Sequence, residues 1–163
     1  MSNDFYQISI KPYAAIIIKI CRAYTNSQED FEDYYQEVCL QIWRTRNNFR
    51  GQSDWSTWVY RLALNVSLTL LKKKKNNPQL FTSEFPQTED VESSPVFADE
   101  ALNDLYDAIK RLSDVDRGVV LLYLEEKSYQ QIADITGTNP NNIGVRITRI
   151  KERLKKLMDG KVN

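Results

Sequence analysis

The apolar residues of this chain recur with a helical period in two blocks, separated by a stretch without any sustained period. In the first block, helical spacing runs from Ile8 to Tyr24 and again from about Gln28 to Arg46. Ser27 stands three residues before Asp30, where a serine can cap the start of a helix. The second of these helices has an inward stripe made of Phe31, Tyr34 or Tyr35, Val38, Ile42 and Trp43. No strand-like alternation interrupts these segments, so the first block is predicted to be all-α.

A polar loop and a third helix complete the first block. Gly51 allows a tight turn, and Ser53 or Asp54 can cap the helix that follows. That helix carries two stripes. The first is apolar and should face a core: Val59, Leu62, Ala63, Val66 and Leu70. The second lies roughly opposite and runs into a lysine cluster: Trp58, Arg61, Asn65, Leu68, Lys72, Lys73, Lys74 and Lys75.

The second stripe suits a strand of unpaired nucleic-acid bases. Bases stack on aromatic rings for about 1–3 kcal/mol each, and cations follow the phosphates. The same residues also fit an ordinary surface, with Trp58 buried, Arg61 solvated and the lysines at a helix end. The stripe by itself leaves both interpretations open.

One face of the helix predicted from about Gln28 to Arg46 also allows two interpretations. Its members are mostly charged or polar, with a leucine among them: Asp33, Gln36, Glu37, Leu40 and Arg44. An exposed leucine between carboxylates suits contact with a partner protein. The alternative is an ordinary polar face.

The second block contains the pattern of a helix-turn-helix, preceded by two amphipathic segments between about residues 98 and 124. Ser128 can cap a short helix, Gly137 supplies a left-handed turn, Asn139 caps the next helix and Pro140 takes its first position. The final helix should bury Ile143, Ile147, Ile150, Leu154 and Leu157. Its polar start carries Asn141, Asn142, Arg146 and Arg149, where a recognition helix meets base edges and phosphates. The alternative is a helical hairpin whose charges only solvate its outer face.

The distribution of charge supports two units joined by a connector. The 163 residues carry no net charge, yet residues 1–78 sum to +4, residues 79–100 to −6 and residues 101–163 to +2. Two basic blocks joined by an acidic stretch remain compatible with nucleic-acid binding. The expected organisation is a helical domain of residues 1–76, a flexible acidic linker of residues 77–97 and a second helical domain of residues 98–163.

Composition narrows the possible chemistry. The chain has no histidine, which removes the commonest acid–base group and metal ligand. Cys21 and Cys39 are expected to be buried free thiols, too few for a structural zinc site. Neither an export signal nor a membrane-spanning run is found, so we expect a cytoplasmic protein that is not inserted in a membrane and is not an enzyme, without metal or cofactor.

Taken together, the two blocks resemble the extracytoplasmic-function class of bacterial RNA polymerase sigma factors. The resemblance covers most of the chain outside the N-terminal dozen residues and the linker. It rests on four segments: residues 30–38, residues 49–65, residues 112–124 and residues 128–154. It implies a first domain that binds core RNA polymerase and captures the melted −10 element. It also implies a second domain that reads the −35 element as duplex DNA.

The resemblance assigns roles to particular residues. The polymerase contacts would be Asp33, Gln36, Glu37 and Leu40. The −10 element would meet Arg50, Gly51, Gln52, Ser53, Asp54, Trp58, Arg61, Asn65, Lys72 and Lys73. The −35 element would meet Asn141, Asn142, Arg146, Thr148 and Arg149. An anti-sigma factor is a possible further partner at the level of the family.

One departure from the family concerns Gly144, which stands where many members place a basic residue. Glycine offers no side-chain contact and costs about 1 kcal/mol of helix propensity. We therefore expect an unusual −35 preference or a weaker contact.

The alternative function is a helix-turn-helix regulator that binds duplex DNA without being a polymerase subunit. An enzyme with a helix-turn-helix tail is a third class, for which residues 1–100 offer no nucleophile–base pair, metal-ligand set or phosphate-binding glycine loop.

Overall fold

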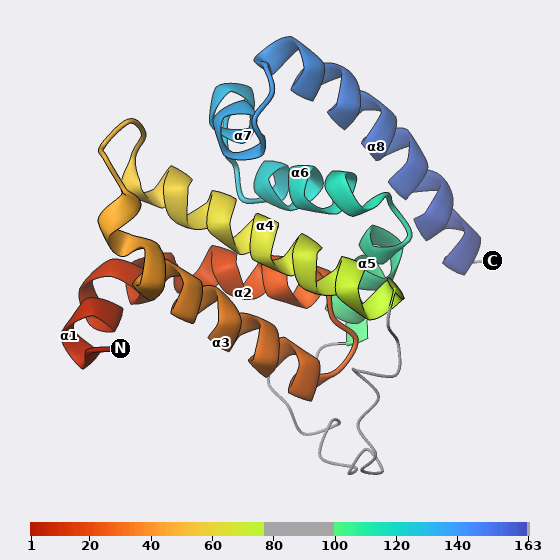
Figure 1. Ribbon diagram of the computed structural model, residues 1–163. Coiled ribbons are helices and arrows are strands. Elements are labelled where there is room, and N and C mark those ends of the chain that lie inside the picture. Colours follow the sequence, from red (N-terminus) through yellow and green to blue (C-terminus); the bar gives the residue numbers. More distant parts are fainter. Residues whose placement is uncertain (77–99, 163) are drawn as a thin grey trace.

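The computed structural model describes residues 1–76 and 100–162, and every element in this part of the chain is helical (Figure 1). This confirms the predicted all-α class. The first half contains α1 (Asn3–Phe5), a π-turn (Tyr6–Ile10), a 3-10 turn (Lys11–Tyr13), α2 (Ala14–Ala23), α3 (Gln28–Thr45), a 3-10 turn (Arg46–Asn48) and α4 (Trp55–Asn76). The second half contains α5 (Glu100–Lys110), α6 (Asp114–Leu124), α7 (Tyr129–Thr136) and α8 (Pro140–Val162). The predicted linker, residues 77–97, lies outside the described residues.

Local sequence signals set the helix boundaries of the first half. The Ser27 hydroxyl accepts a hydrogen bond from the Asp30 backbone N–H at 3.2 Å, which confirms the predicted cap of α3. The helical pattern that starts at Ile8 becomes a regular α-helix only at Ala14. The irregular turns before it contain Pro12, which has no N–H to donate and whose ring excludes the carbonyl four residues earlier.

The buried face of α4 differs from the predicted stripe. Val59 and Ala63 are buried as predicted, whereas Leu62, Val66 and Leu70 are only half-buried. Three residues outside that stripe are buried instead: Tyr60, Leu64 and Ser67. The difference arises because α4 is covered on two sides, by α2 and α3 of its own half and by α7 of the second half.

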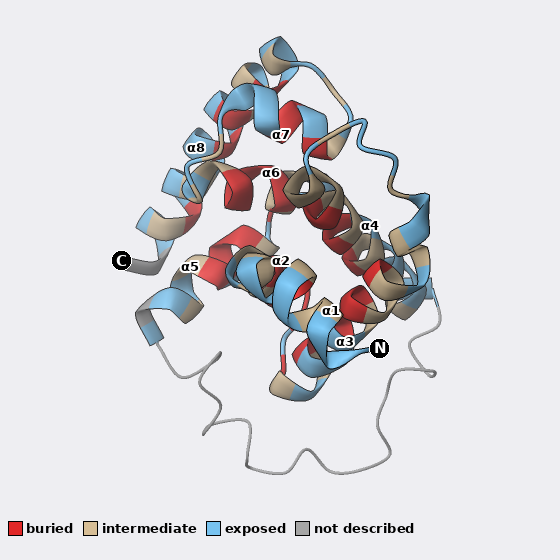
Figure 2. Ribbon diagram, turned by 90° about the vertical axis from the view of Figure 1, so that its left-hand side faces the viewer, coloured by how far each residue is buried: buried red, intermediate tan, exposed pale blue. Residues whose placement is uncertain are grey.

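The two halves pack against each other through a continuous hydrophobic core (Figure 2). Gly118 of α6 faces Leu64 of α4 so closely that an added Cβ would lie 2.6 Å from the Leu64 Cδ2 atom. The small volume of glycine therefore allows α6 to approach α4. A second contact joins α2 to α5, where the guanidinium of Arg22 lies 4.2 Å from the centre of the Tyr106 ring.

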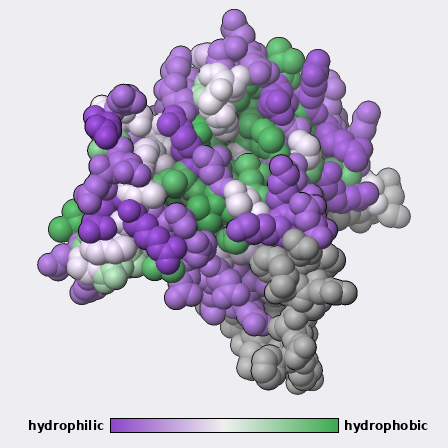
Figure 3. All heavy atoms as spheres, viewed as in Figure 1, coloured by the Kyte–Doolittle hydropathy of each residue, from purple (hydrophilic) through white to green (hydrophobic). Residues whose placement is uncertain are grey.

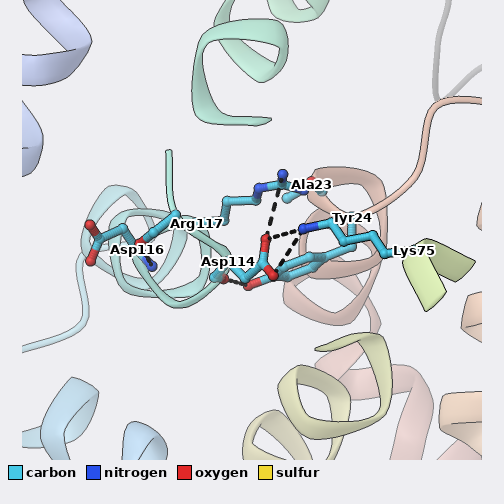
Figure 4. A network of polar contacts seen from close by, with 7 residues as sticks. Ala23, Tyr24, Lys75, Asp114, Asp116 and Arg117 are labelled. Atoms are coloured by element: carbon cyan, nitrogen blue, oxygen red, sulfur yellow. Dashed lines mark hydrogen bonds and ion pairs between the residues drawn. The ribbon is translucent and has the colours of Figure 1, made fainter. Parts of the chain in front are cut away.

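Polar contacts join the same two halves (Figure 4). The Tyr24 hydroxyl donates to the backbone carbonyl of Asp114 at 2.6 Å, and Lys75 Nζ lies 3.1 Å from the carboxylate of Asp114. Arg117 Nη1 donates to the backbone carbonyl of Ala23 at 3.3 Å. Burial raises the pKa of the Tyr24 phenol, so this hydroxyl keeps its proton and remains a donor. The interface thus combines apolar packing with directional hydrogen bonds.

The second half contains the predicted helix-turn-helix. Ser128 and Gln131 form a reciprocal capping box at the start of α7. Gly137 ends α7 with a φ of 83°, a left-handed conformation that glycine adopts without strain. Asn139 Oδ1 then accepts a hydrogen bond from the Asn142 backbone N–H at 2.8 Å, and α8 starts at Pro140. The Ser113 hydroxyl accepts a hydrogen bond from the Asp116 backbone N–H at 3.3 Å and so caps the start of α6.

The helices of the described residues include none that is both long enough and apolar enough to cross a bilayer.

Candidate nucleic-acid interface

The loop before α4 is open to solvent. Arg50, Gly51, Gln52 and Asp54 are exposed, and Ser53 is half-buried. Gly51 has a φ of 72°, which confirms the need for glycine there. The Asp54 carbonyl accepts the first helical hydrogen bond, from the Trp58 backbone N–H at 3.2 Å, so the helix starts directly after Asp54. This loop presents backbone and side-chain polar groups on the surface beside α4.

An aromatic cluster stands next to this loop. Trp58 lies 4.9 Å from Trp55 and 5.6 Å from Phe49, measured between ring centres. The Trp55 indole N–H donates to the backbone carbonyl of Ser9 at 2.8 Å, which fixes that ring. Trp58 is half-buried, with one part packed in the cluster and another part at the surface. The two interpretations of Trp58 are therefore compatible, because one ring can pack and still offer area for a base.

The packing of the two halves leaves some residues of the second stripe of α4 exposed and places others in contacts within the protein. Asn65, Lys72 and Lys73 are exposed. The Arg61 guanidinium instead donates a hydrogen bond to the backbone carbonyl of Asp134 in α7. The last two lysines of the run are paired, Lys74 with Asp30 at 2.7 Å and Lys75 with Asp114 at 3.1 Å.

The start of α8 presents a polar face to solvent. Ile143, Ile147 and Ile150 are buried beneath it. The opposite face is exposed and consists of Asn141, Asn142, Val145, Thr148 and Arg149. Two of its polar side chains are engaged within the protein. The Asn142 amide donates to the Thr138 hydroxyl at 2.8 Å, and the Thr148 hydroxyl donates to the Gly144 carbonyl at 3.0 Å.

Arg146 does not share this exposed face. Its Nη1 atom lies 2.7 Å from a carboxylate oxygen of Asp116, the residue at the start of α6. The pair joins α8 to α6, so Arg146 helps to hold the position of the helix. Next to it, Gly144 packs beside the Tyr129 ring, where an added Cβ would lie 3.4 Å from the nearest ring carbon.

A groove runs between α3 and α4 on the face shown in Figure 3, where hydrophobic side chains reach the surface among hydrophilic ones. One hollow of about 280 Å³ is lined by Asp30, Asp33, Tyr34, Gln36, Glu37, Leu40, Leu70 and Lys74. It brings together the four residues predicted to bind a partner, and it adds Leu70 and Lys74 from α4. Leu40 is half-buried in this groove, so it is less exposed than the sequence pattern predicted.

The described residues contain no group of three His, Cys, Asp or Glu side chains able to hold a metal ion. Cys21 and Cys39 are buried free thiols, as predicted. Burial raises the pKa of Cys21 to about 12 and that of Cys39 to about 11, so both remain protonated at neutral pH. The described surface offers aromatic rings, amides, cations and a groove lined by apolar and acidic side chains.

The fold and the site define a helical protein of two halves, the second of which contains a helix-turn-helix. Residues 10–77 match the family model of Sigma-70 region 2, and residues 102–154 match that of Sigma-70 region 4. The chain belongs to the extracytoplasmic-function RNA polymerase sigma factors, as its sequence pattern indicates.

Relatives of known identity agree with this assignment. The chain is 30% identical to SigG of Mycobacterium tuberculosis over 89% of its length, and it spans only 46% of that longer protein. It is 28% identical to SigW of Bacillus subtilis, with 94% of this chain and 89% of SigW covered. Its fold is similar to that of the sigma factor RpoE of Bartonella quintana, solved in complex with the anti-sigma factor NepR. The TM-score is 0.73, at 21% identity, over 97% of this chain and 98% of that one.

Two features of the site were missed by the sequence interpretation. Val145 lies on the exposed face of α8, three or four positions from four of the residues predicted to contact the −35 element. The 3.6-residue period would have placed it there. Lys74 and Leu70 of the groove had no such signal, because their role depends on the approach of α4 to α3.

Proposed function

We propose that this protein is a transcription initiation factor that binds core RNA polymerase and directs it to specific promoters. The observation that supports the proposal most is the pairing, in one chain, of an exposed helix-turn-helix face with an exposed loop and aromatic cluster at the start of α4. The first surface suits intact duplex DNA, and the second suits separated strands. A regulator that binds only duplex DNA has no need of the second surface.

The groove between α3 and α4 is the proposed docking site for the polymerase. Leu40 and Leu70 give it an apolar floor, while Asp33 and Glu37 give it an acidic rim. A partner helix with apolar residues flanked by cations would fit it. We assign Asp33, Gln36, Glu37 and Leu40 to this contact.

Both promoter surfaces belong to the proposal. The −10 strand would meet the loop from Arg50 to Asp54, then Trp58, Arg61, Asn65, Lys72 and Lys73. The −35 duplex would meet Asn141, Asn142, Thr148 and Arg149, with Arg146 acting mainly through its pair with Asp116. The role is one of binding rather than catalysis, and we place it in the cytoplasm, where polymerase and chromosome are found. An anti-sigma factor is a further proposed partner, since the similar protein RpoE was solved with one.

The test is promoter binding with and without core polymerase. We expect weak, non-specific binding by the free chain and specific binding once core polymerase is added. Leu40→Arg should weaken the affinity for core polymerase about tenfold or more, the equivalent of about 1.4 kcal/mol. Ile8→Arg is the matched control, because Ile8 is 73% exposed and lies outside the groove. Equally tight and specific binding by the chain alone would instead favour a conventional helix-turn-helix regulator.

A further inference from the structure

An exposed valine, Val145, lies in the middle of the exposed face of α8 that we assign to the −35 duplex. This reading face consists of Asn141, Asn142, Val145, Thr148 and Arg149. Successive residues of a helix are separated by about 100° around its axis. On this basis Val145 lies within the arc bounded by Thr148 on one side and Asn142 on the other, while Arg146 lies beyond its edge. Val145 is 52% exposed, and the buried Ile143 and Ile147 lie on the opposite side.

The neighbours of Val145 leave its methyl groups accessible. Gly144, the preceding residue, has no side chain, and its Cα faces the Tyr129 ring. The Thr148 hydroxyl, one turn further on, is engaged with the Gly144 carbonyl. The Asn142 amide, one turn before, donates to Thr138. Two of the nearest polar side chains thus donate hydrogen bonds within the protein, whereas the valine exposes its methyl groups to solvent.

A single exposed valine is ordinary on a protein surface. Its place is what matters here, because the N-terminal residues of a recognition helix contact base edges in the major groove, and Val145 lies in the second turn of α8. The only apolar group on a base edge in that groove is the 5-methyl of thymine, which small apolar side chains contact. Valine is also held in one preferred rotamer in a helix, so little side-chain freedom is lost on contact.

We propose that Val145 reads the 5-methyl group of one thymine in the −35 element. The inference rests on the proposed function, because it requires α8 to enter the major groove of promoter DNA. It identifies a specificity-determining residue and the chemical group that this residue recognises.

The experiment uses holoenzyme assembled from core polymerase and the full chain. A duplex is first selected from a library with a randomised −35 region. Each thymine of the selected element is then replaced, one at a time, by deoxyuridine, which removes only the methyl group. We expect one replacement to weaken binding about fourfold, the effect of one methyl group returned to water.

The Val145→Ala variant should lose affinity for the thymine duplex and show no further loss with deoxyuridine. Val145→Thr keeps a branched methyl and should retain the discrimination. Val115→Ala is the matched control, because Val115 is 48% exposed but lies on α6, away from the reading face; it should behave like the unchanged protein.

Several results would overturn the assignment. These are a selected −35 element without a fixed thymine, deoxyuridine replacement without effect at every position, or an undiminished deoxyuridine effect in Val145→Ala. If the holoenzyme selects no sequence beyond what core polymerase alone selects, the proposed function fails as well. The two failures are therefore distinguishable.

Discussion

The Arg61 guanidinium on α4 donates a hydrogen bond to the backbone carbonyl of Asp134 on α7, 73 positions later in the chain. Arg61 belongs to the proposed −10 surface, and α7 belongs to the helix-turn-helix. In this arrangement the Arg61 side chain links the two halves, so contact of Arg61 with a DNA strand requires this hydrogen bond to break. Because the acceptor is a backbone atom, substitution of the Asp134 side chain leaves it in place.

The two halves pack against each other in the free chain, and we predict that they move apart when core polymerase binds. Fluorophores on Glu32→Cys of α3 and Glu152→Cys of α8, both exposed positions, report the distance between the halves. We expect high energy transfer in the free chain and a clear decrease with core polymerase. Unchanged transfer in an active holoenzyme would show that the halves stay closed during function.

A larger residue at the interface should separate the halves without polymerase. Gly118→Leu places a side chain where an added Cβ already lies 2.6 Å from Leu64 Cδ2. We expect reduced energy transfer in the free chain with helical content retained, since leucine is a better helix former than glycine by about 1 kcal/mol. Gly160→Leu is the control, because nothing lies within 4 Å of its added Cβ.

Truncation of Trp58 should impair promoter opening more than polymerase binding. The ring is half-buried beside Phe49 and Trp55, so Trp58→Ala removes a stacking surface worth about 1–3 kcal/mol per base. Fluorescence of 2-aminopurine in the −10 element measures opening, and a pull-down measures binding to core polymerase. Trp58→Phe keeps an aromatic face and should retain most of the opening. A defect confined to polymerase binding would show that Trp58 is only a packing residue.

Arg146 and Arg149 should differ in their effect on DNA binding. Arg149 is exposed on the reading face, whereas Arg146 is paired with Asp116 at 2.7 Å. If Arg149 contacts a base, Arg149→Ala should weaken holoenzyme binding to the −35 duplex by about 1–3 kcal/mol. If it contacts a phosphate, the slope of log affinity against log salt concentration should instead become shallower by about one. Arg146→Ala should cost less in affinity and instead lower the unfolding free energy by up to about 1 kcal/mol, because its pair is partly exposed. Asp116→Asn should match Arg146→Ala in stability; a much larger loss of DNA affinity from Arg146→Ala alone would show direct readout.

The buried thiols predict how stability changes with pH. Burial raises the pKa of Cys21 from 9.0 to about 12 and that of Cys39 from 9.0 to about 11. Above pH 9 the unfolded chain releases these protons while the folded protein retains them. The contribution of these two thiols to the unfolding free energy should therefore be constant below pH 9 and fall as the pH rises toward 12. Chemical denaturation of the Cys21→Ala, Cys39→Ala double variant should show a smaller decrease over this range. An equal decrease would assign the effect to tyrosines alone.

The sequence by itself determined the parts of this protein that depend on near neighbours. Ser27, the Ser128–Gln131 box and Asn139 cap their helices through atoms three residues away, and Gly137 turns the chain through its own backbone. Such contacts involve only residues close together in the sequence, so the helix-turn-helix could be predicted from the sequence alone. The same holds for the exposed loop before α4.

Only the tertiary structure decided which faces are covered. Leu64 is buried because Gly118 lies against it, Arg61 is engaged because α7 crosses α4, and Arg146 is paired because Asp116 is brought beside it. These partners stand 54, 73 and 30 positions apart in the chain. Hydrophobic periodicity indicates that a helix has an apolar face, but it does not indicate how many neighbouring helices cover that helix. The approach of distant helices is fixed by packing across the whole core, and no local pattern encodes it.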